Sequence, residues 1–156
     1  VESVVSGFSG GKRPNPSSDA VYTGVTGHAE VIQVEFDSAV ITLDDILSVF
    51  FSTHDPTSLN RQGNDTGSQY RSMILYTSEI QKDTAERSKK KLEKEGVYEE
   101  SIVTEITPLN TFHTAEEYHQ KYYDKYSEEP YCTYVINPKI QKLLSKFGKL
   151  VKDEYK

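Results

Sequence analysis

Three short polar clusters in this sequence hold side chains that could bind a small ligand and transfer a proton to it. The first, Gly27-His28-Ala29-Glu30, places a carboxylate at the start of an amphipathic segment. Residues 62–70 (QGNDTGSQY) gather amides, a carboxylate and a phenol around two glycines, and residues 118–122 (YHQKY) add two more phenols. Glycine-rich loops of this kind beside strands can build a pocket of hydrogen-bond donors, which suits a small, strongly accepting oxygen. The same clusters are also typical of well-capped turns, and their spacing alone leaves both interpretations open.

The histidines give a weaker signal. His28 stands two residues before Glu30, which on a strand puts both side chains on one face. Glu116 and His119 have the i, i+3 spacing found in carboxylate metal sites on helices. A single pair of this kind arises by chance on any charged helix, so we predict no metal site. His54 is typical of a histidine at a helix end, where it stabilises the last carbonyl groups.

Composition narrows the class of protein. The 156 residues fit one domain, and the formal net charge of -6 argues against nucleic acid as the main partner. No stretch approaches the ~20 apolar residues that a transmembrane helix needs, so no membrane association is expected. The single cysteine, Cys132, excludes a disulfide within these residues and a thiolate zinc cluster. Taken alone, Cys132 is typical of a small buried hydrophobic residue.

The hydrophobic pattern predicts strands and helices that would position these clusters. Strands are expected at 1–8, 29–37, 70–76 and 102–106, and helices at 43–53, 79–95, 115–126 and 138–155. Thr42 and Asp45 are spaced like a capping box in front of the first helix. Residues 54–69 are almost entirely polar, and loops of that length are usually functional or disordered. The order of these predicted strands and helices lacks the regular strand–helix alternation of a doubly wound fold. We therefore predict the α+β class. The expected architecture is a ferredoxin-like two-layer sandwich with a mixed, mostly antiparallel sheet and helices packed on it.

The polar clusters lie in longer motifs that resemble the methionine sulfoxide reductase A family along nearly the whole chain. The strongest match is the segment at 60–72 (NRQGNDTGSQYRS), which contains the second polar cluster. The other matching segments, in the family's order, are GFSGG at 7–11, GHAEV at 27–31, HDPT at 54–57, TEI at 104–106 and AEEYHQ at 115–120. The resemblance implies a single domain of this family over residues 1–156.

The resemblance implies an oxidoreductase for protein repair under oxidative stress, which reduces the S-epimer of methionine sulfoxide, free or in proteins. A cysteine thiolate attacks the sulfoxide sulfur, and the oxygen must gain protons. Glu30 is implied as the general acid, which should be neutral near pH 7 and hence shielded from water. Asp65 is similar to the family's supporting carboxylate, and Tyr70 and Tyr122 are similar to the phenols that hydrogen-bond the oxygen. Cys132 falls about where the family carries its resolving cysteine, which converts the sulfenic acid into a disulfide.

Two departures from the family pattern are visible. The Gly-Cys-Phe-Trp motif that carries the family's nucleophile is absent from these residues, which start at Val1 and hold one methionine, Met73. We therefore expect the sequence to start downstream of that motif and of the family's first strand and catalytic helix, and the chain alone to lack reductase activity. Where the family often has a tyrosine after Asn-Pro, this chain has Ser17 and Ser18. One hydroxyl to the sulfoxide oxygen is then lost, or is replaced from Tyr22.

The resemblance also sets the expected partners. Thioredoxin or another external dithiol would reduce the disulfide, and no cofactor is expected. We expect a cytoplasmic monomer that binds neither nucleic acid nor membranes. The alternative function is a non-catalytic domain that recognises oxidised methionine, or a protein partner, through the same pocket. A Gly-Cys-Phe-Trp segment in front of Val1 in the native protein would distinguish the two.

Overall fold

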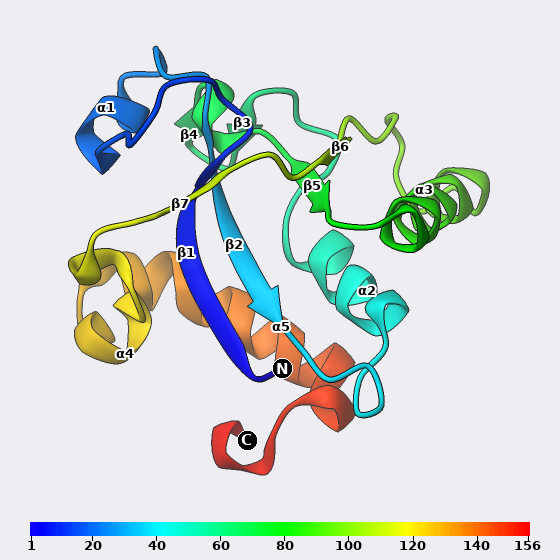
Figure 1. Cartoon of the computed structure of the whole chain (residues 1–156). Coiled ribbons are helices and arrows are strands. Elements are labelled where there is room, and N and C mark those ends of the chain that lie inside the picture. The colour runs from blue at the N-terminus through cyan, green and yellow to red at the C-terminus, as the bar shows by residue number, and fades with distance from the viewer. The chain divides into compact units, whose positions relative to one another are not determined.

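The computed structural model describes residues 1–156 and divides into two compact units, Val1–Glu116 and Glu117–Lys156. Figure 1 traces the elements of both units along the chain. The strands of the first unit are β1 (Ser3–Ser9), β2 (Ala29–Glu35), β3 (Arg61–Gln62), β4 (Asp65–Thr66), β5 (Met73–Tyr76), β6 (Glu105–Pro108) and β7 (Phe112–Thr114). Its helices are α1 (Ser18–Tyr22), α2 (Leu43–Thr53), the 3₁₀ turn η1 (Ser68–Tyr70) and α3 (Glu79–Lys94). That residues 1–156 act as a single domain stays a prediction.

Strand β1 is the middle strand of a three-stranded antiparallel sheet in the order β2-β1-β7. Its register with β2 places Phe8 opposite Glu30 and Gly7 opposite Val31. Position 7 has to be glycine, because an added Cβ would collide with the ring of Phe112 on β7. The sheet therefore packs β1 closely against β7 and carries Glu30 on the outer strand β2.

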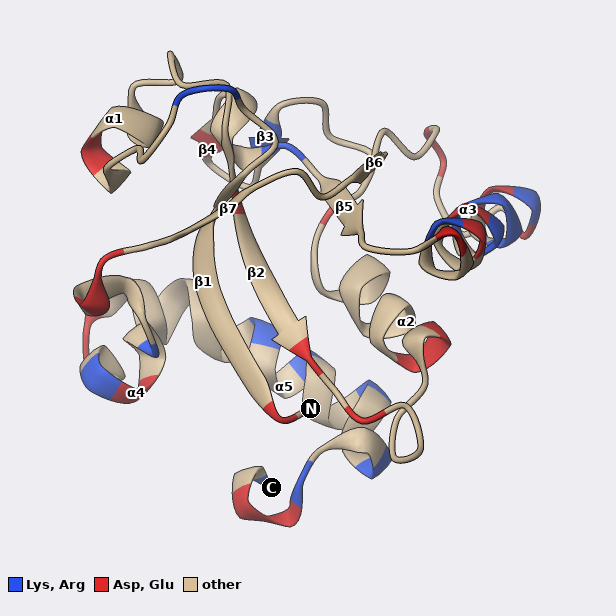
Figure 2. Cartoon of the chain, in the orientation of Figure 1, with Lys and Arg blue, Asp and Glu red and all other residues tan.

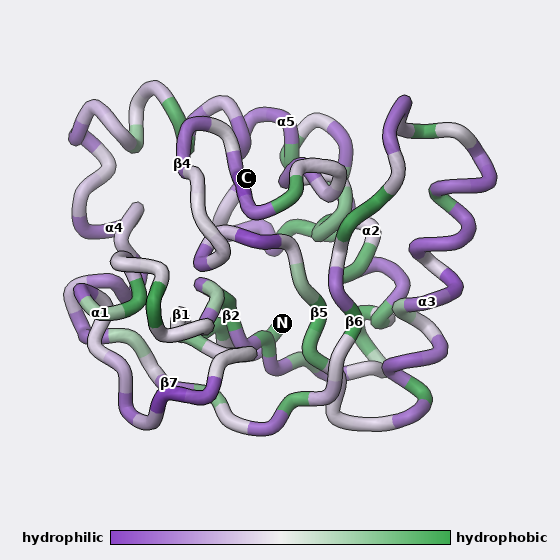
Figure 3. The backbone as a smooth tube through the Cα atoms, turned by 90° about the horizontal axis from the view of Figure 1, so that it is seen from above, coloured by the Kyte–Doolittle hydropathy of each residue, from purple (hydrophilic) through white to green (hydrophobic).

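The main core of the first unit involves α2, α3 and the parallel strand pair β5–β6. Leu47 and Phe51 from α2, Ala85 from α3 and Ile102 are buried together. Figure 3 shows β5 as a hydrophobic stretch and α3 as largely hydrophilic. Figure 2 shows that α3 carries Lys or Arg and Asp or Glu in close succession. Helix α3 is thus mostly exposed to solvent and packs against the core only through a narrow buried side.

Local signals predicted helix α2 to the residue. The Thr42 hydroxyl oxygen accepts the Asp45 N–H at 3.1 Å, and the Asp45 carboxylate accepts the Thr42 N–H at 3.3 Å, which confirms the capping box. His54 follows the last turn, and its Nδ1 is hydrogen-bonded to the Phe50 carbonyl. The prediction of His54 as a helix-end residue is therefore confirmed.

Phe51→Ala is expected to destabilise the first unit by about 3–5 kcal/mol, because it leaves a cavity in the core. The Phe51 side chain is 1% exposed, and its ring meets that of Phe50 edge-on, with centroids 5.2 Å apart. Urea denaturation followed by circular dichroism measures the change. Ile80→Ala on α3 is the control, because Ile80 is 78% exposed and its loss should change stability by less than ~0.5 kcal/mol. Equal losses in the two variants would contradict this core assignment.

The second unit consists of short helical elements. They are η2 (Glu117–His119), α4 (Tyr122–Tyr126), the π-helical turn η3 (Cys132–Ile136), α5 (Asn137–Phe147), and the 3₁₀ turns η4 (Gly148–Leu150) and η5 (Asp153–Tyr155). Two helix predictions were therefore too long. The helix expected at 115–126 is interrupted at Lys121, whose φ of 51° lies in the left-handed region. The helix expected at 138–155 ends at Phe147, before Gly148.

Two strand predictions also differ from the structure. Strand β5 begins at Met73 rather than at residue 70, because residues 68–70 form the 3₁₀ turn η1. The strand expected at 102–106 is displaced to β6, and Ile102 instead packs in the core. Strand β7 was not predicted, because it has only three residues and pairs with a strand about a hundred residues earlier.

The predicted α+β class is confirmed, and so is a mixed, mostly antiparallel strand pairing. The ferredoxin-like label is not confirmed, because the strands form three small sheets rather than one. None of the helices combines the length and the apolar composition that crossing a membrane requires.

Candidate functional site

Glu30 is the second residue of β2, where the backbone is fixed by pairing with β1. Its side chain is exposed in this structure. The shielding from water that was expected for a general acid is therefore not provided by the surroundings of Glu30 in this chain. What the fold does provide is a fixed position for Glu30 opposite the buried Phe8.

The segment that leads into β2 is held by His28, whose side chain is 1% exposed. Its Nδ1 accepts the N–H of Gly11 at 3.0 Å, and its Nε2 donates to the carbonyl of Arg13 at 2.7 Å. The tautomer with its hydrogen on Nε2 satisfies both bonds. Its edge also meets the ring of His113, with centroids 5.1 Å apart. His28 thus fixes the backbone two residues before Glu30 and is not placed as a metal ligand.

The polar segment at 60–70 forms a tight hairpin followed by a turn. Strands β3 and β4 pair so that Gln62 lies opposite Asp65, whose side chain is exposed. The N–H of Gly67 donates to the Asn60 carbonyl at 2.8 Å and closes the hairpin. The turn η1 follows and ends at Tyr70, which is half-buried. Part of the polar segment, whose length is typical of a functional or a disordered loop, is therefore ordered by its own backbone hydrogen bonds.

Gln69 fills the space inside this turn. Its side chain is 6% exposed, and its Nε2 donates to the main-chain carbonyl of Tyr22 at 3.0 Å. Gly67 leaves room for it, because a Cβ at position 67 would overlap the Gln69 amide. The φ of Gly67 is 142° and its ψ is 158°, a conformation almost restricted to glycine. Gln69 therefore depends on Gly67 to connect η1 with the end of α1.

Gly67→Ala is expected to destabilise the first unit by at least about 1–3 kcal/mol, because it imposes both backbone strain and a clash with Gln69. Thermal or urea unfolding measures the loss. Gly63→Ala is the matched control, because Gly63 also has a positive φ, of 57°, but a methyl group added there would have no atom within 4 Å. The free energy of unfolding of that control should fall by only roughly 1–2 kcal/mol, the cost of placing alanine in a left-handed conformation. If both variants lose the same amount, the clash with Gln69 contributes nothing.

Arg71 makes a second connection, directly after Tyr70. Its Nη1 donates to the Ser68 carbonyl at 2.8 Å, and its Nη2 donates to the Gly27 carbonyl at 3.0 Å. Its Nε lies 3.5 Å from a carboxylate oxygen of Glu105. The Arg71 side chain is 13% exposed, whereas that of Glu105 is 46% exposed. The guanidinium therefore joins the turn η1 to the segment that precedes Glu30.

These connections bring three of the five predicted site residues into one region. Turn η1 packs against both β2 and β3, so the segments that carry Glu30, Tyr70 and Asp65 are neighbours. Sequence reasoning did not single out Gln69, Arg71 or the structural role of His28. The motif at 60–72 contains Gln69 and Arg71, but their contacts are with residues 22 and 27, more than forty positions earlier.

The other two predicted site residues, Tyr122 and Cys132, lie in the second unit. Tyr122 begins α4, where its ring lies 4.8 Å from the Tyr126 ring and 6.4 Å from the Tyr131 ring, measured between centroids. Cys132 is fully buried at the start of the π-helical turn η3. A π-helical turn inside a helix is uncommon and is frequent at functional sites.

The loop after α2 shows how polar groups fix the backbone around the hairpin. The hydroxyls of Ser58 and Thr57, together with the Thr57 N–H, lower the pKa of Asp55 below its ordinary value of 3.8. Burial, followed by the nearby charge of Asp55, raises the pKa of Tyr98. Asp55 therefore stays ionised and Tyr98 protonated near neutral pH, and the Tyr98 hydroxyl donates to the Phe51 carbonyl at 2.6 Å.

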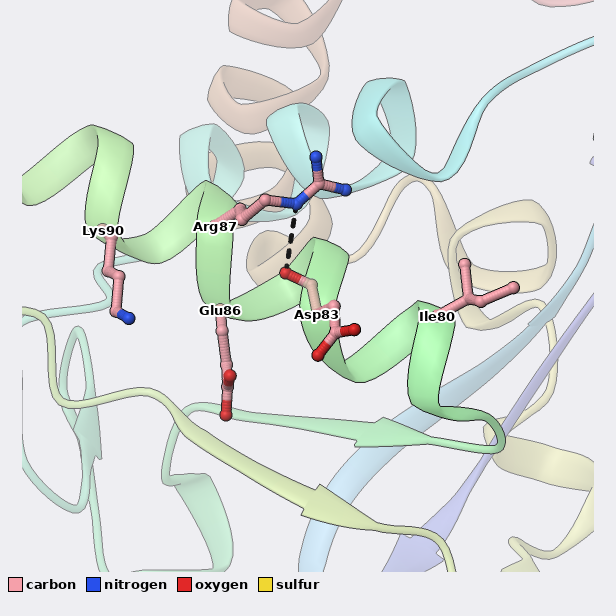
Figure 4. A pocket seen from close by; sticks show the side chains of 5 residues that line it. All are labelled: Ile80, Asp83, Glu86, Arg87 and Lys90. Atoms are coloured by element: carbon pink, nitrogen blue, oxygen red, sulfur yellow. Dashed lines mark hydrogen bonds between the residues drawn. The ribbon is translucent and has the colours of Figure 1, made fainter.

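No group of three or more His, Cys, Asp or Glu side chains is placed to hold a metal ion. A shallow hollow lies along α3, lined by Ile80, Asp83, Glu86, Arg87 and Lys90 (Figure 4). There the Arg87 Nε donates to the Asp83 carbonyl within the same helix, at 3.4 Å. The hollow contains none of the predicted site residues and has the character of a charged, solvated helix surface.

Comparisons with known proteins match this arrangement. Residues 1–150 match the family described as peptide methionine sulfoxide reductase. The peptide methionine sulfoxide reductase MsrA of Nautilia profundicola is 51% identical over 144 residues, which cover 92% of this chain and 82% of that protein. The MsrA of Sulfolobus acidocaldarius is 52% identical over 147 residues, which cover 94% and 82%.

Solved structures agree with the sequence comparisons. Reduced Mxr1 from Saccharomyces cerevisiae superposes with a TM-score of 0.77 at 35% identity, covering 83% of this chain and 74% of that one. Methionine sulfoxide reductase A of Corynebacterium diphtheriae superposes with a TM-score of 0.71 at 36% identity, covering 81% and 64%. Sequence and structure agree over most of the chain, which therefore belongs to the peptide methionine sulfoxide reductase family.

Proposed function

We propose that this protein reduces the S-epimer of methionine sulfoxide, free or in proteins, to methionine by thiol chemistry. The observation that carries the proposal is the family match over residues 1–150, which includes every predicted site residue. The connections made by Gln69 and Arg71 support it, because they hold the segments of Glu30 and Tyr70 together.

The proposed reaction needs two thiols and an external reductant. A nucleophilic cysteine attacks the sulfoxide sulfur, and the oxygen passes to the cysteine, which leaves methionine and a cysteine sulfenic acid. A second thiol then attacks the sulfenic sulfur, so that a disulfide forms and water leaves. Thioredoxin or another dithiol reduces that disulfide and is itself oxidised. No prosthetic group enters these steps.

The residues of this chain take separate parts in the proposal. Glu30, which is exposed in this structure, donates a proton to the sulfoxide oxygen once the bound substrate shields its carboxyl from water. The phenols of Tyr70 and Tyr122 hydrogen-bond that oxygen. Asp65 is the supporting carboxylate near the nucleophile. Cys132 is the resolving thiol, and because it is buried, the turn η3 has to open before Cys132 can form a disulfide. A monomeric state and a cytoplasmic location stay predictions.

The replacement for the tyrosine that the family often has after Asn-Pro belongs to the same proposal. Ser18 at that position is fully buried, and its N–H donates to the Glu116 carboxylate at 3.0 Å. Its side chain is too short to reach a ligand as a phenol would. Tyr22, at the other end of α1, is 37% exposed, and its carbonyl is held by Gln69. We therefore favour Tyr22 as the source of the missing hydroxyl.

The test uses the extended protein, meaning this chain preceded by the family's first strand and catalytic helix with their Gly-Cys-Phe-Trp motif. It is given the separate S and R epimers of N-acetylmethionine sulfoxide with dithiothreitol, and methionine formation is measured. Only the S-epimer is expected to react. The control replaces the cysteine of the added segment by serine, which should abolish turnover. If neither epimer is reduced, the non-catalytic binding domain becomes the better interpretation.

A further inference from the structure

We propose that Arg71 is a positioning residue that sets the spacing between Glu30 and Tyr70. The proposal rests on the function proposed above and adds a residue to which the sequence motifs gave no role. Arg71 follows Tyr70 directly, and its Nη2 bonds to the carbonyl of Gly27, three residues before Glu30. Its Nη1 bonds to the carbonyl of Ser68, two residues before Tyr70.

The geometry of these contacts requires a guanidinium group. Two main-chain carbonyls from segments more than forty residues apart accept from the two terminal nitrogens of one planar group, at 2.8 Å and 3.0 Å. Arginine holds five donors in a fixed plane, so that fixing one bond fixes the direction of the other. The single ammonium nitrogen of lysine cannot reach both carbonyls in the same geometry.

The carbonyl contacts, and not the ion pair, carry the positioning. The Arg71–Glu105 contact is 3.5 Å long, and Glu105 is 46% exposed, so solvent screens the pair and its contribution is small. The Arg71 side chain is only 13% exposed, and its loss leaves the half-buried Ser68 carbonyl and the more exposed Gly27 carbonyl without their donor.

Gln69 gives the same pair of segments a second connection. Its Nε2 bonds to the Tyr22 carbonyl, while Arg71 bonds to the Gly27 carbonyl. Tyr70 thus stands between two side chains that both reach back to the segment leading into β2. Holding the backbone on each side of Tyr70 limits where its phenol can lie relative to β2, the strand that carries Glu30. Two groups that act on one sulfoxide oxygen need such a limited spacing.

The test is a double-mutant cycle in the extended protein, read as the single-turnover rate of methionine formation. Arg71→Lys is expected to lower that rate roughly 10- to 100-fold, as a misplacement of about 1 Å does. In a Glu30→Gln background, Arg71→Lys should cost less than about threefold, because the acid that Arg71 positions is already gone. A general loss of stability would instead give independent, multiplying effects in the cycle, and this result would overturn the proposal.

Two controls separate the carbonyl contacts from charge and from arginine loss in general. Arg87→Lys on α3 makes the same change in the charged helix surface of Figure 4 and should leave the rate unchanged. Glu105→Gln removes only the ion pair and should cost much less than Arg71→Lys. Equal losses in Glu105→Gln and Arg71→Lys would assign the effect to the ion pair and contradict the positioning role.

A second measurement tests the positioning without any activity. In the 156-residue chain, hydrogen exchange is measured at the amides of residues 28–30 and 69–71. Arg71→Lys should speed exchange in both segments together and leave α2 unchanged. Unchanged exchange in either segment would overturn the proposal even if the extended protein is active. A different result is also informative: the extended wild-type protein could be inactive while Arg71→Lys still speeds exchange in both segments together. That result would support the positioning role of Arg71 and contradict only the proposed function.

Discussion

Glu30→Gln in the extended protein is expected to slow the reduction of methionine sulfoxide by roughly 10²–10⁴-fold, the usual contribution of a positioned general acid. The amide keeps the size and the hydrogen-bonding capacity of the side chain but has no acidic proton to give. The oxygen would then have to leave the sulfur without a proton from the protein, which is unfavourable. Rapid-quench measurement of methionine released in a single turnover isolates this step from disulfide recycling.

Glu35→Gln is the matched control for Glu30→Gln. Glu35 lies on the same strand, is also exposed, and accepts a hydrogen bond from Ser3 at 2.9 Å. Its replacement changes the charge by the same amount and should leave the rate unaltered. If Glu30→Gln and Glu35→Gln have the same rate as the wild type, the proton comes from another group and Glu30 is not the acid.

Cys132→Ser is expected to abolish multiple turnover with thioredoxin while leaving the first turnover intact. The first step needs only the nucleophilic thiolate and the acid, so methionine is still released once. The sulfenic acid then persists, because an alcohol cannot form the disulfide that thioredoxin reduces. Dithiothreitol is small enough to attack the sulfenic acid directly and should restore turnover. The ratio of the two reductant-dependent rates is the quantity to measure.

Cys132→Ala controls for the burial of a hydroxyl group. Cys132 is completely buried, so Cys132→Ser puts a polar hydroxyl group where the less polar thiol was packed. Alanine removes the thiol without adding a hydroxyl. Loss of thioredoxin turnover in both variants would identify the thiol as the resolving group. Equal losses with thioredoxin and dithiothreitol would instead make Cys132 a structural residue.

The parts of the fold that could be predicted depend on nearby residues. Helix α2 was predicted from its first to its last residue, because Thr42, Asp45 and the helical apolar spacing all act within one helix. Strand β2 was predicted from its alternation, and it ends only two residues earlier than expected. At Tyr70 the strand pattern of residues 70–76 competes with a turn. The turn prevails, because Gly67 and the 3₁₀ hydrogen bonds fix the backbone there.

The parts that could not be predicted depend on residues far apart in the sequence. The pairing of β7, the contact of Arg71 with Gly27 and the burial of Gln69 against Tyr22 have no local pattern. The exposed position of Glu30 was likewise not visible, because the alternation of β2 shows which residues share a face and not what covers that face. The candidate residues came from the motif resemblance, whereas the groups that hold them in place came only from the structure.

The pairing of β7 with β1 has a consequence for the order in which the chain folds. Ser9 pairs with Ala29 across 20 residues of sequence but with Phe112 across 103. Closing the longer loop costs only about 1.5 kcal/mol more by polymer entropy, yet contacts of large sequence separation form slowly. During synthesis β1 and β2 can pair as soon as β2 leaves the ribosome, while the other edge of β1 waits until β7 has been made. An exposed strand edge in that interval is a site for mispairing with another chain. Glycine weakens a strand, so Gly7 makes β1 a poor template for such mispairing, and the residue that allows β7 to pack closely also protects the nascent chain.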